Sequence, residues 1–83
     1  MKSIYKKELI LIYINSKKNK NSIELTYLLG YSHKQLDYIL KGLEKDGDIF
    51  YNNKVTRLKL TEQGKEYLRK ENLLKIKYQD LIL

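Results

Sequence analysis

The chain has 83 residues, of which 42% are hydrophobic and 33% are charged, so it can form one domain with a core but not a two-domain enzyme. It contains no cysteine, which excludes disulfides and thiolate metal sites, and no apolar run approaches the roughly 18 residues of a membrane span. The net charge of +7 indicates an anionic partner. Because the N-terminus also lacks the pattern of a signal peptide, we expect a cytoplasmic protein without a membrane partner.

The positive charge also has a compositional explanation. The chain contains 15 lysines but 2 arginines, together with 8 tyrosines and 9 isoleucines, which is a bias that an AT-rich genome favours. The positions of the cations are therefore more informative than their number. Residues 1–42 carry 8 lysines and 3 acids, whereas residues 43–83 carry 9 bases and 7 acids, so most of the excess lies in the first half.

A helix is predicted over residues 3–15, where apolar residues such as Leu9, Ile12 and Tyr13 recur at helical spacing. The run Leu9–Ile14 would also fit a buried strand, and the length of the segment favours the helix. The lysine- and asparagine-rich residues 16–21 predict an exposed connection.

Two capping signals follow one another closely. Asn21 and Glu24 have the spacing of a capping box, and Gly30 is typical of a helix stop. Ser32 and Gln35 repeat the box. Two helices are therefore predicted with about three residues between them, which is the spacing of a helix-turn-helix.

The helix predicted over residues 33–46 is amphipathic and should end at Gly47. Its inward stripe consists of Leu36, Ile39, Leu40 and Leu43. At about 100° per residue, its opposite face consists of Lys34, Tyr38, Lys41 and Lys45. The centre of that outer face is free of acids.

Residues 48–52 and 55–60 predict a β-hairpin around a turn that includes Asn52, Asn53 and Lys54. The second strand alternates, with Thr56, Leu58 and Leu60 on the face expected to pack on the helices. The other face carries Val55, Arg57 and Lys59. One side of the hairpin should therefore present two cations to solvent.

Thr61 predicts the cap of a final helix that continues to residue 83, and some 22 residues would extend about 33 Å, longer than such a domain is wide. This segment, residues 61–83, is therefore a candidate dimerisation helix. Its apolar residues at roughly helical spacing are Tyr67, Leu68, Leu74, Tyr78, Leu81 and Ile82. The alternative is a break near Asn72, with residues 73–83 folding back onto the same protomer.

The order of these elements resembles that of winged helix-turn-helix domains. Residues 45–49 (Lys-Asp-Gly-Asp-Ile) are similar to the end of a recognition helix that enters the wing. Residues 58–64 (Leu-Lys-Leu-Thr-Glu-Gln-Gly) resemble the strand-to-helix junction of MarR-like and PadR-like regulators, and the chain also resembles the small phage-associated YjcQ-like group.

This resemblance implies a single domain over residues 1–83, mainly α with a small β-hairpin, comprising a three-helix core, a two-stranded wing and a C-terminal helix. It further implies a repressor that binds double-stranded DNA sequence-specifically and acts by occupying an operator, and the candidate dimerisation helix over residues 61–83 indicates a homodimer. Lysines would contact guanine or phosphate, glutamine an adenine edge, and tyrosine a thymine methyl or a phosphate. The expected DNA contacts are Ser32, His33, Lys34, Gln35, Tyr38, Lys41 and Lys45 on the helix, and Lys54, Arg57 and Lys59 on the wing.

Other interpretations stay open. The basic face could be an ordinary solvated surface, a site for an acidic protein in an anti-repressor or replication adaptor, or a non-specific nucleic-acid surface. His33 and Asp37 stand one turn apart, but they are too few for a metal site, and no nucleophile with its base stands out. We therefore expect neither an enzyme nor a cofactor.

The tyrosines divide into two groups. Those at helical spacing with leucines are expected in the core or at its rim, and they are Tyr5, Tyr13, Tyr27 and Tyr67. Tyr31 and Tyr38 are the exposed candidates, although Tyr31 could equally cap the helix pair.

Overall fold

The computed structural model describes residues 6–17, 20–52 and 57–80. It confirms a mainly helical chain with a small two-stranded antiparallel sheet. The elements in chain order are α1 (Lys6–Ser16), α2 (Ser22–Leu29), α3 (His33–Lys45), β1 (Ile49–Phe50), β2 (Lys59–Leu60), α4 (Glu62–Lys70) and the 3₁₀ helix η2 (Tyr78–Asp80). None of the helices in the described ranges is long and apolar enough to cross a membrane.

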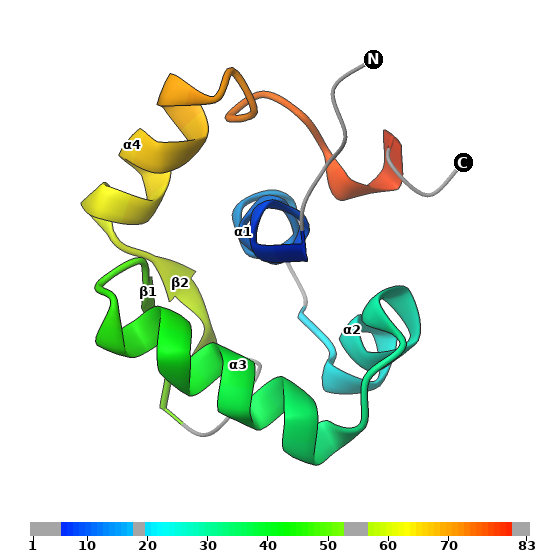
Figure 1. Ribbon diagram of the computed structural model, residues 1–83. Coiled ribbons are helices and arrows are strands. Elements are labelled where there is room, and N and C mark those ends of the chain that lie inside the picture. The colour runs from blue at the N-terminus through cyan, green and yellow to red at the C-terminus, as the bar shows by residue number, and fades with distance from the viewer. Residues whose placement is uncertain (1–5, 18–19, 53–56, 81–83) are drawn as a thin grey trace.

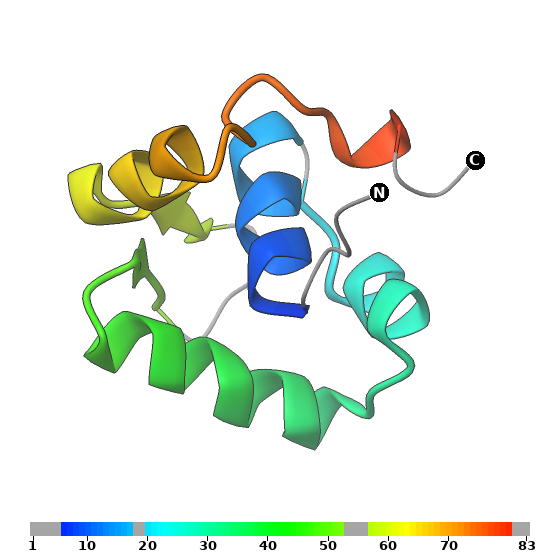
Figure 2. The ribbon, with the colours of Figure 1, turned by 45° about the horizontal axis from the view of Figure 1, so that its top comes forward.

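Helix α1 is the centre of the molecule. Seen along its axis, α2, α3, the hairpin, α4 and η2 surround it (Figure 1), and α3 runs below it in the turned view (Figure 2). All five residues of the range 10–14 are buried, so this helix has no solvent-facing stripe over that turn and a half. A helix enclosed in this way can be apolar all round, which explains why the same run also fitted a buried strand.

The α2–turn–α3 unit is held by local hydrogen bonds. The Asn21 side chain caps α2 by accepting from the Ile23 amide at 2.8 Å, and Gly30 ends the helix at a φ of 68°. Ser32 and Gln35 form a complete capping box, with bonds of 3.2 and 2.9 Å. These predicted caps are confirmed.

The second capping partner predicted for α2 is wrong. The Glu24 carboxylate turns away from the cap and accepts a hydrogen bond of 3.2 Å from the Tyr78 hydroxyl. It also lies 3.7 Å from the Lys17 ammonium. A tertiary contact with η2 has therefore replaced the local hydrogen bond.

The hairpin is shorter than the sequence indicates. Ile49 pairs with Leu60 and Phe50 with Lys59, and the ladder then ends. The Tyr51 amide donates instead to the Glu44 carboxylate at 3.2 Å, so the chain turns toward α3. Over residues 57–60 the predicted alternation is confirmed, because Leu58 and Leu60 are buried while the two cations are exposed; Lys54, Val55 and Thr56 lie outside the described residues.

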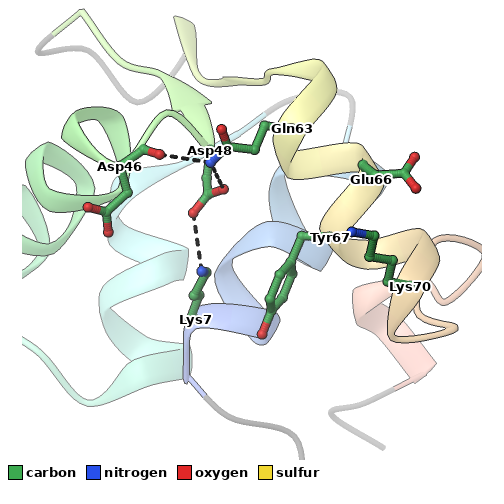
Figure 3. Close-up of a pocket in the computed structure, with 7 residues that line it drawn as sticks. All are labelled: Lys7, Asp46, Asp48, Gln63, Glu66, Tyr67 and Lys70. Atoms are coloured by element: carbon green, nitrogen blue, oxygen red, sulfur yellow. Dashed lines mark hydrogen bonds and ion pairs between the residues drawn. The ribbon is translucent and has the colours of Figure 1, made fainter.

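The junction between α3, the hairpin and α4 is built around Asp48, which is buried (Figure 3). Its carboxylate lies 3.2 Å from the Lys7 ammonium and accepts from the Gln63 amide group at 3.0 Å. Its backbone carbonyl accepts from the Thr61 amide at 3.1 Å. These contacts place the start of α4 against the end of α3, and they involve Thr61 and Gln63 of the Leu58–Gly64 motif.

The continuous C-terminal helix predicted from Thr61 is wrong, and the break near Asn72 is confirmed. Helix α4 ends at Lys70, Asn72 adopts a φ of 60°, and the Leu73 amide bonds back to the Leu68 carbonyl at 2.7 Å. Asparagine tolerates this left-handed conformation better than other side chains apart from glycine. Residues 73–80 then return across α1, because Leu73 and Tyr78 find buried positions there.

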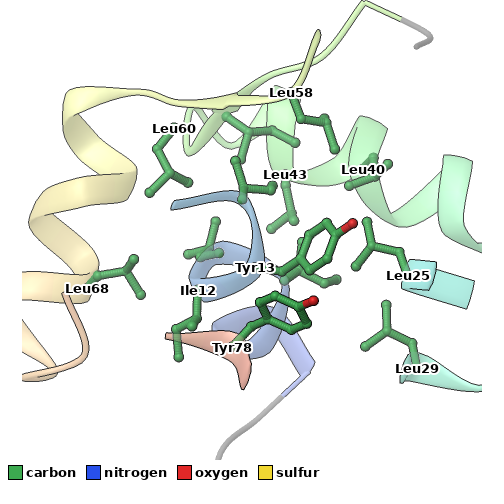
Figure 4. Close-up of a cluster of buried hydrophobic side chains, with 14 of the residues drawn as sticks. Ile12, Tyr13, Leu25, Leu29, Leu40, Leu43, Leu58, Leu60, Leu68 and Tyr78 are labelled. Carbon is green, nitrogen blue, oxygen red and sulfur yellow. The ribbon is translucent and has the colours of Figure 1, made fainter. Parts of the chain in front are cut away.

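The core joins α1 to this returning segment (Figure 4). The rings of Tyr13 and Tyr78 pack edge to face, with centroids 5.2 Å apart. The Tyr13 hydroxyl accepts from the Asn21 amide at 2.8 Å, and the Tyr78 amide donates to the Ser16 hydroxyl at 3.1 Å. The C-terminal segment is therefore part of the protomer's own core.

Candidate nucleic-acid interface

The outer face of α3 carries four exposed side chains in the predicted arrangement: Lys34, Tyr38, Lys41 and Lys45. Tyr38 retains 80% of its accessible surface, whereas Leu36, Leu40 and Leu43 on the opposite side are buried. Because the buried stripe fixes the rotation of the helix, the basic stripe must point to solvent. We call these four residues the α3 face.

The N-terminal turn of α3 presents Ser32, His33 and Gln35 at the surface. The side chains of Ser32 and Gln35 are already engaged, because each accepts a hydrogen bond from the other's backbone amide in the capping box. The side-chain carbonyl of Gln35 accepts from Ser32, which leaves its NH₂ group to donate elsewhere. A bidentate contact between Gln35 and an adenine would therefore require the capping box to open.

One flank of α3 is acidic and faces the hairpin. Asp37 accepts a hydrogen bond of 2.5 Å from the Tyr51 hydroxyl and lies 3.0 Å from the Lys41 ammonium. The hydrogen bond from Tyr51, followed by that from Lys41, lowers the pKa of Asp37. Burial, followed by the hydrogen bond to Asp37, raises the pKa of Tyr51 to about 12. Lys41 is therefore partly neutralised. Among the described residues, Lys34 and Lys45 form no ion pair.

Sequence reasoning missed Tyr51. Its position after a short β-rich run marks it only as a strand end, and its partner Asp37 is 14 residues away. The only sequence signal for a functional role was a hydroxyl-bearing aromatic residue at the end of this strand. The pairing itself depends on how the hairpin leaves α3.

A hollow of about 350 Å³ adjoins the other flank of α3, and we call it the α3 hollow. The residues lining it are Tyr31, Lys34, Gln35, Tyr38 and Ile39. Tyr31 is half-buried, with the Lys6 ammonium 4.3 Å from the centre of its ring. The expectation that Tyr27 packs in the core or at its rim is wrong, because 85% of its surface is exposed.

Of the three cations expected on the hairpin, the described residues include two. Arg57 and Lys59 are exposed, and Lys54 lies outside the described residues. Lys59 borders a separate hollow that α1, β2 and α4 line together with Lys20, and none of the described residues lining it belongs to α3. The structure therefore groups Lys59 with Lys20 and Lys65.

The residues predicted to dimerise are divided. Leu68 and Tyr78 are buried in the protomer's own core, Tyr67 and Leu74 are half-buried, and Leu81 and Ile82 lie outside the described residues. The Tyr67 hydroxyl donates to the buried Glu8 carboxylate at 3.1 Å. Packing within one chain therefore uses much of the surface that a continuous helix would have offered to a partner.

Comparisons of this chain with protein-family models, with curated proteins and with solved structures give no match. Within residues 6–17, 20–52 and 57–80, no three histidine, aspartate or glutamate side chains gather in a group that could hold a metal ion. The candidate site is accordingly an exposed surface that carries cations and tyrosines.

Proposed function

We propose that this chain is a winged helix-turn-helix protein that binds double-stranded DNA sequence-specifically and represses transcription by occupying an operator. The observation that carries the proposal is the α3 face, where three lysines and a tyrosine stand exposed along one side of a single helix. The capping box at one end of α3 and the Asp48 junction beyond its other end hold this helix in place.

The geometry of α3 supports insertion into a groove. The major groove of B-DNA is about 12 Å wide and admits one α-helix. Lysines along the inserted face can reach guanine acceptors or phosphates, and the exposed ring of Tyr38 can contact a thymine methyl. Lys34 and Lys45 are the strongest candidates for phosphate contact, because Lys41 also pairs with Asp37.

Selection of bound sequences from a random pool of DNA duplexes tests the proposal. We expect one sequence to be enriched and the variant Lys34→Glu/Lys41→Glu to lose affinity for it by at least a hundredfold. The matched control is Lys75→Glu/Lys77→Glu, which makes the same change of charge at two exposed lysines of the C-terminal segment. Equal losses in the two variants, or the absence of an enriched sequence, would contradict specific binding through α3.

The α3 hollow favours a second candidate function, that of an adaptor which binds an acidic protein. Two tyrosines and Ile39 line a hollow beside Lys34, and such a mixed surface suits a protein partner as well as a nucleic acid. In that case Lys34→Glu/Lys41→Glu abolishes capture of the partner while DNA mobility shifts stay unchanged. A non-specific nucleic-acid binder would bind DNA with strong salt dependence but enrich no sequence.

The homodimer is a separate part of the proposal. A twofold dimer would place two α3 helices about 34 Å apart, one turn of DNA, and would select a palindromic site. Light scattering on the full chain measures its mass in solution. A monomer at the concentrations used for DNA binding, together with an asymmetric selected site, would refute the dimer.

A further inference from the structure

Three lysines from distant parts of the sequence converge on one hollow of about 300 Å³. Lys20 precedes α2, Lys59 lies in β2 and Lys65 in α4. We call this site the lysine hollow. The buried residues Ile14, Leu58 and Leu60 also line it.

The lysine hollow is unbalanced in charge. No carboxylate is among the described residues that line it. The Lys65 ammonium lies 3.8 Å from the carboxylate of Glu62, which does not line the hollow, and the Glu62 side chain is 92% exposed, so this ion pair is weak. Burial of Lys20, together with the proximity of Lys59, lowers the pKa of Lys20. Like charges held together at a partly buried site destabilise each other unless an anion joins them.

We propose that the lysine hollow binds a phosphate anion through Lys20, Lys59 and Lys65. Lysine ammonium groups act as point charges toward phosphate oxygens, and three of them around one hollow match a multiply charged anion. The volume is at the lower end of the range for ligand pockets, which favours a small group such as a diphosphate over a large organic ligand.

Two sources share this chemistry. The phosphate belongs either to a free diphosphate or to the backbone of a nucleic acid that continues past α3. The proposal does not depend on the sequence-specific function of α3, because α3 contributes no described residue to this hollow.

Titration calorimetry with sodium pyrophosphate, and fluorescence anisotropy with a labelled DNA duplex, both at low salt, test the site. The variant is Lys20→Gln/Lys59→Gln/Lys65→Gln. The control is Lys70→Gln/Lys75→Gln/Lys77→Gln, which removes the same charge from three exposed lysines that do not line the hollow. Circular dichroism establishes that each variant is folded, and the single variant Lys20→Gln replaces the triple variant if the latter is not.

Pyrophosphate binding that weakens at least tenfold in the hollow variant, and is retained in the control and in Lys34→Glu/Lys41→Glu, supports a free anion as the ligand. Duplex binding that weakens at least tenfold beyond the control, without pyrophosphate binding, supports the nucleic-acid backbone. If neither affinity differs between the hollow variant and the control, the phosphate site is overturned, whatever the α3 variant does.

Discussion

The backbone carbonyl of Asp48 packs so closely on Gly64 that a Cβ at residue 64 would lie 2.2 Å from the carbonyl oxygen. The same carbonyl accepts the hydrogen bond of the Thr61 amide, so it cannot withdraw without breaking the cap region of α4. Glycine is required at this position by the close approach of two backbones. Its backbone does not adopt a positive φ.

Gly64→Ala should therefore destabilise the protein by about 3 kcal/mol or more, because a rigid backbone must move to admit one methyl group. The control is Gly42→Ala on the exposed side of α3, where a Cβ would meet no atom within 4 Å. That change should stabilise by roughly 0.5–1 kcal/mol through helix propensity. Urea unfolding measures both, and equal effects would show that the close approach at Gly64 is relieved at little cost.

Tyr78→Ala should lower the free energy of unfolding by about 3–5 kcal/mol, as for other large buried aromatic side chains. The ring packs on Tyr13, and the hydroxyl donates to Glu24. Gln79→Ala changes an exposed neighbour in the same 3₁₀ helix and should stay within about 0.5 kcal/mol. A small loss in Tyr78→Ala, measured by urea unfolding, would mean that the returning C-terminal segment contributes little to the core.

Stability should decline above pH 10, in part because of Tyr13. Burial raises the pKa of Tyr13 from 10.0 to about 12. Between these values the unfolded chain releases the proton while the folded chain keeps it, so unfolding becomes more favourable as pH rises, by roughly 2–3 kcal/mol in total for this group. Urea unfolding at pH 9 to 12 should show a steeper decline for the natural chain than for Tyr13→Phe, and identical slopes would exclude Tyr13 as the cause.

Asp37→Asn should strengthen the proposed DNA binding, because it removes the negative charge 3.0 Å from the Lys41 ammonium. The electrostatic interaction energy of one surface charge is roughly 1 kcal/mol. We therefore expect the affinity for DNA to rise by about threefold to fivefold at low salt. Asp80→Asn removes an exposed acid from η2 and serves as the control. The same rise in both variants, measured by fluorescence anisotropy, would mean that only net charge matters.

The proposed DNA binding should depend steeply on salt. If about six phosphates are neutralised, the affinity falls roughly 10³-fold between 50 and 200 mM salt. Anisotropy titrations across that range, on the selected sequence and on a scrambled duplex, measure the slope. A salt-independent affinity would be incompatible with a lysine-based interface.

Features that depend on neighbours within one helical turn or one strand could be predicted from the amino-acid sequence. The capping box of Ser32 and Gln35, the stop at Gly30 and the buried stripe of α3 were all predictable, because their hydrogen bonds and periodicity are local. For the same reason, the helical periodicity of about 100° per residue predicted that the α3 face points to solvent.

The contacts between distant segments could not be predicted in this way, because they depend on how the helices and strands pack. No glycine or proline marks the break at Asn72, and it occurs because Leu73 and Tyr78 gain buried positions on α1. Because α1 is enclosed, its buried residues 10–14 include no polar position that would mark a solvent-facing side. The burial of the whole turn could therefore not be predicted from hydrophobic periodicity. Strand alternation predicts that Lys59 lies on the exposed face of the hairpin, but its grouping with Lys20 and Lys65 depends on how α1, β2 and α4 pack, which no local pattern contains.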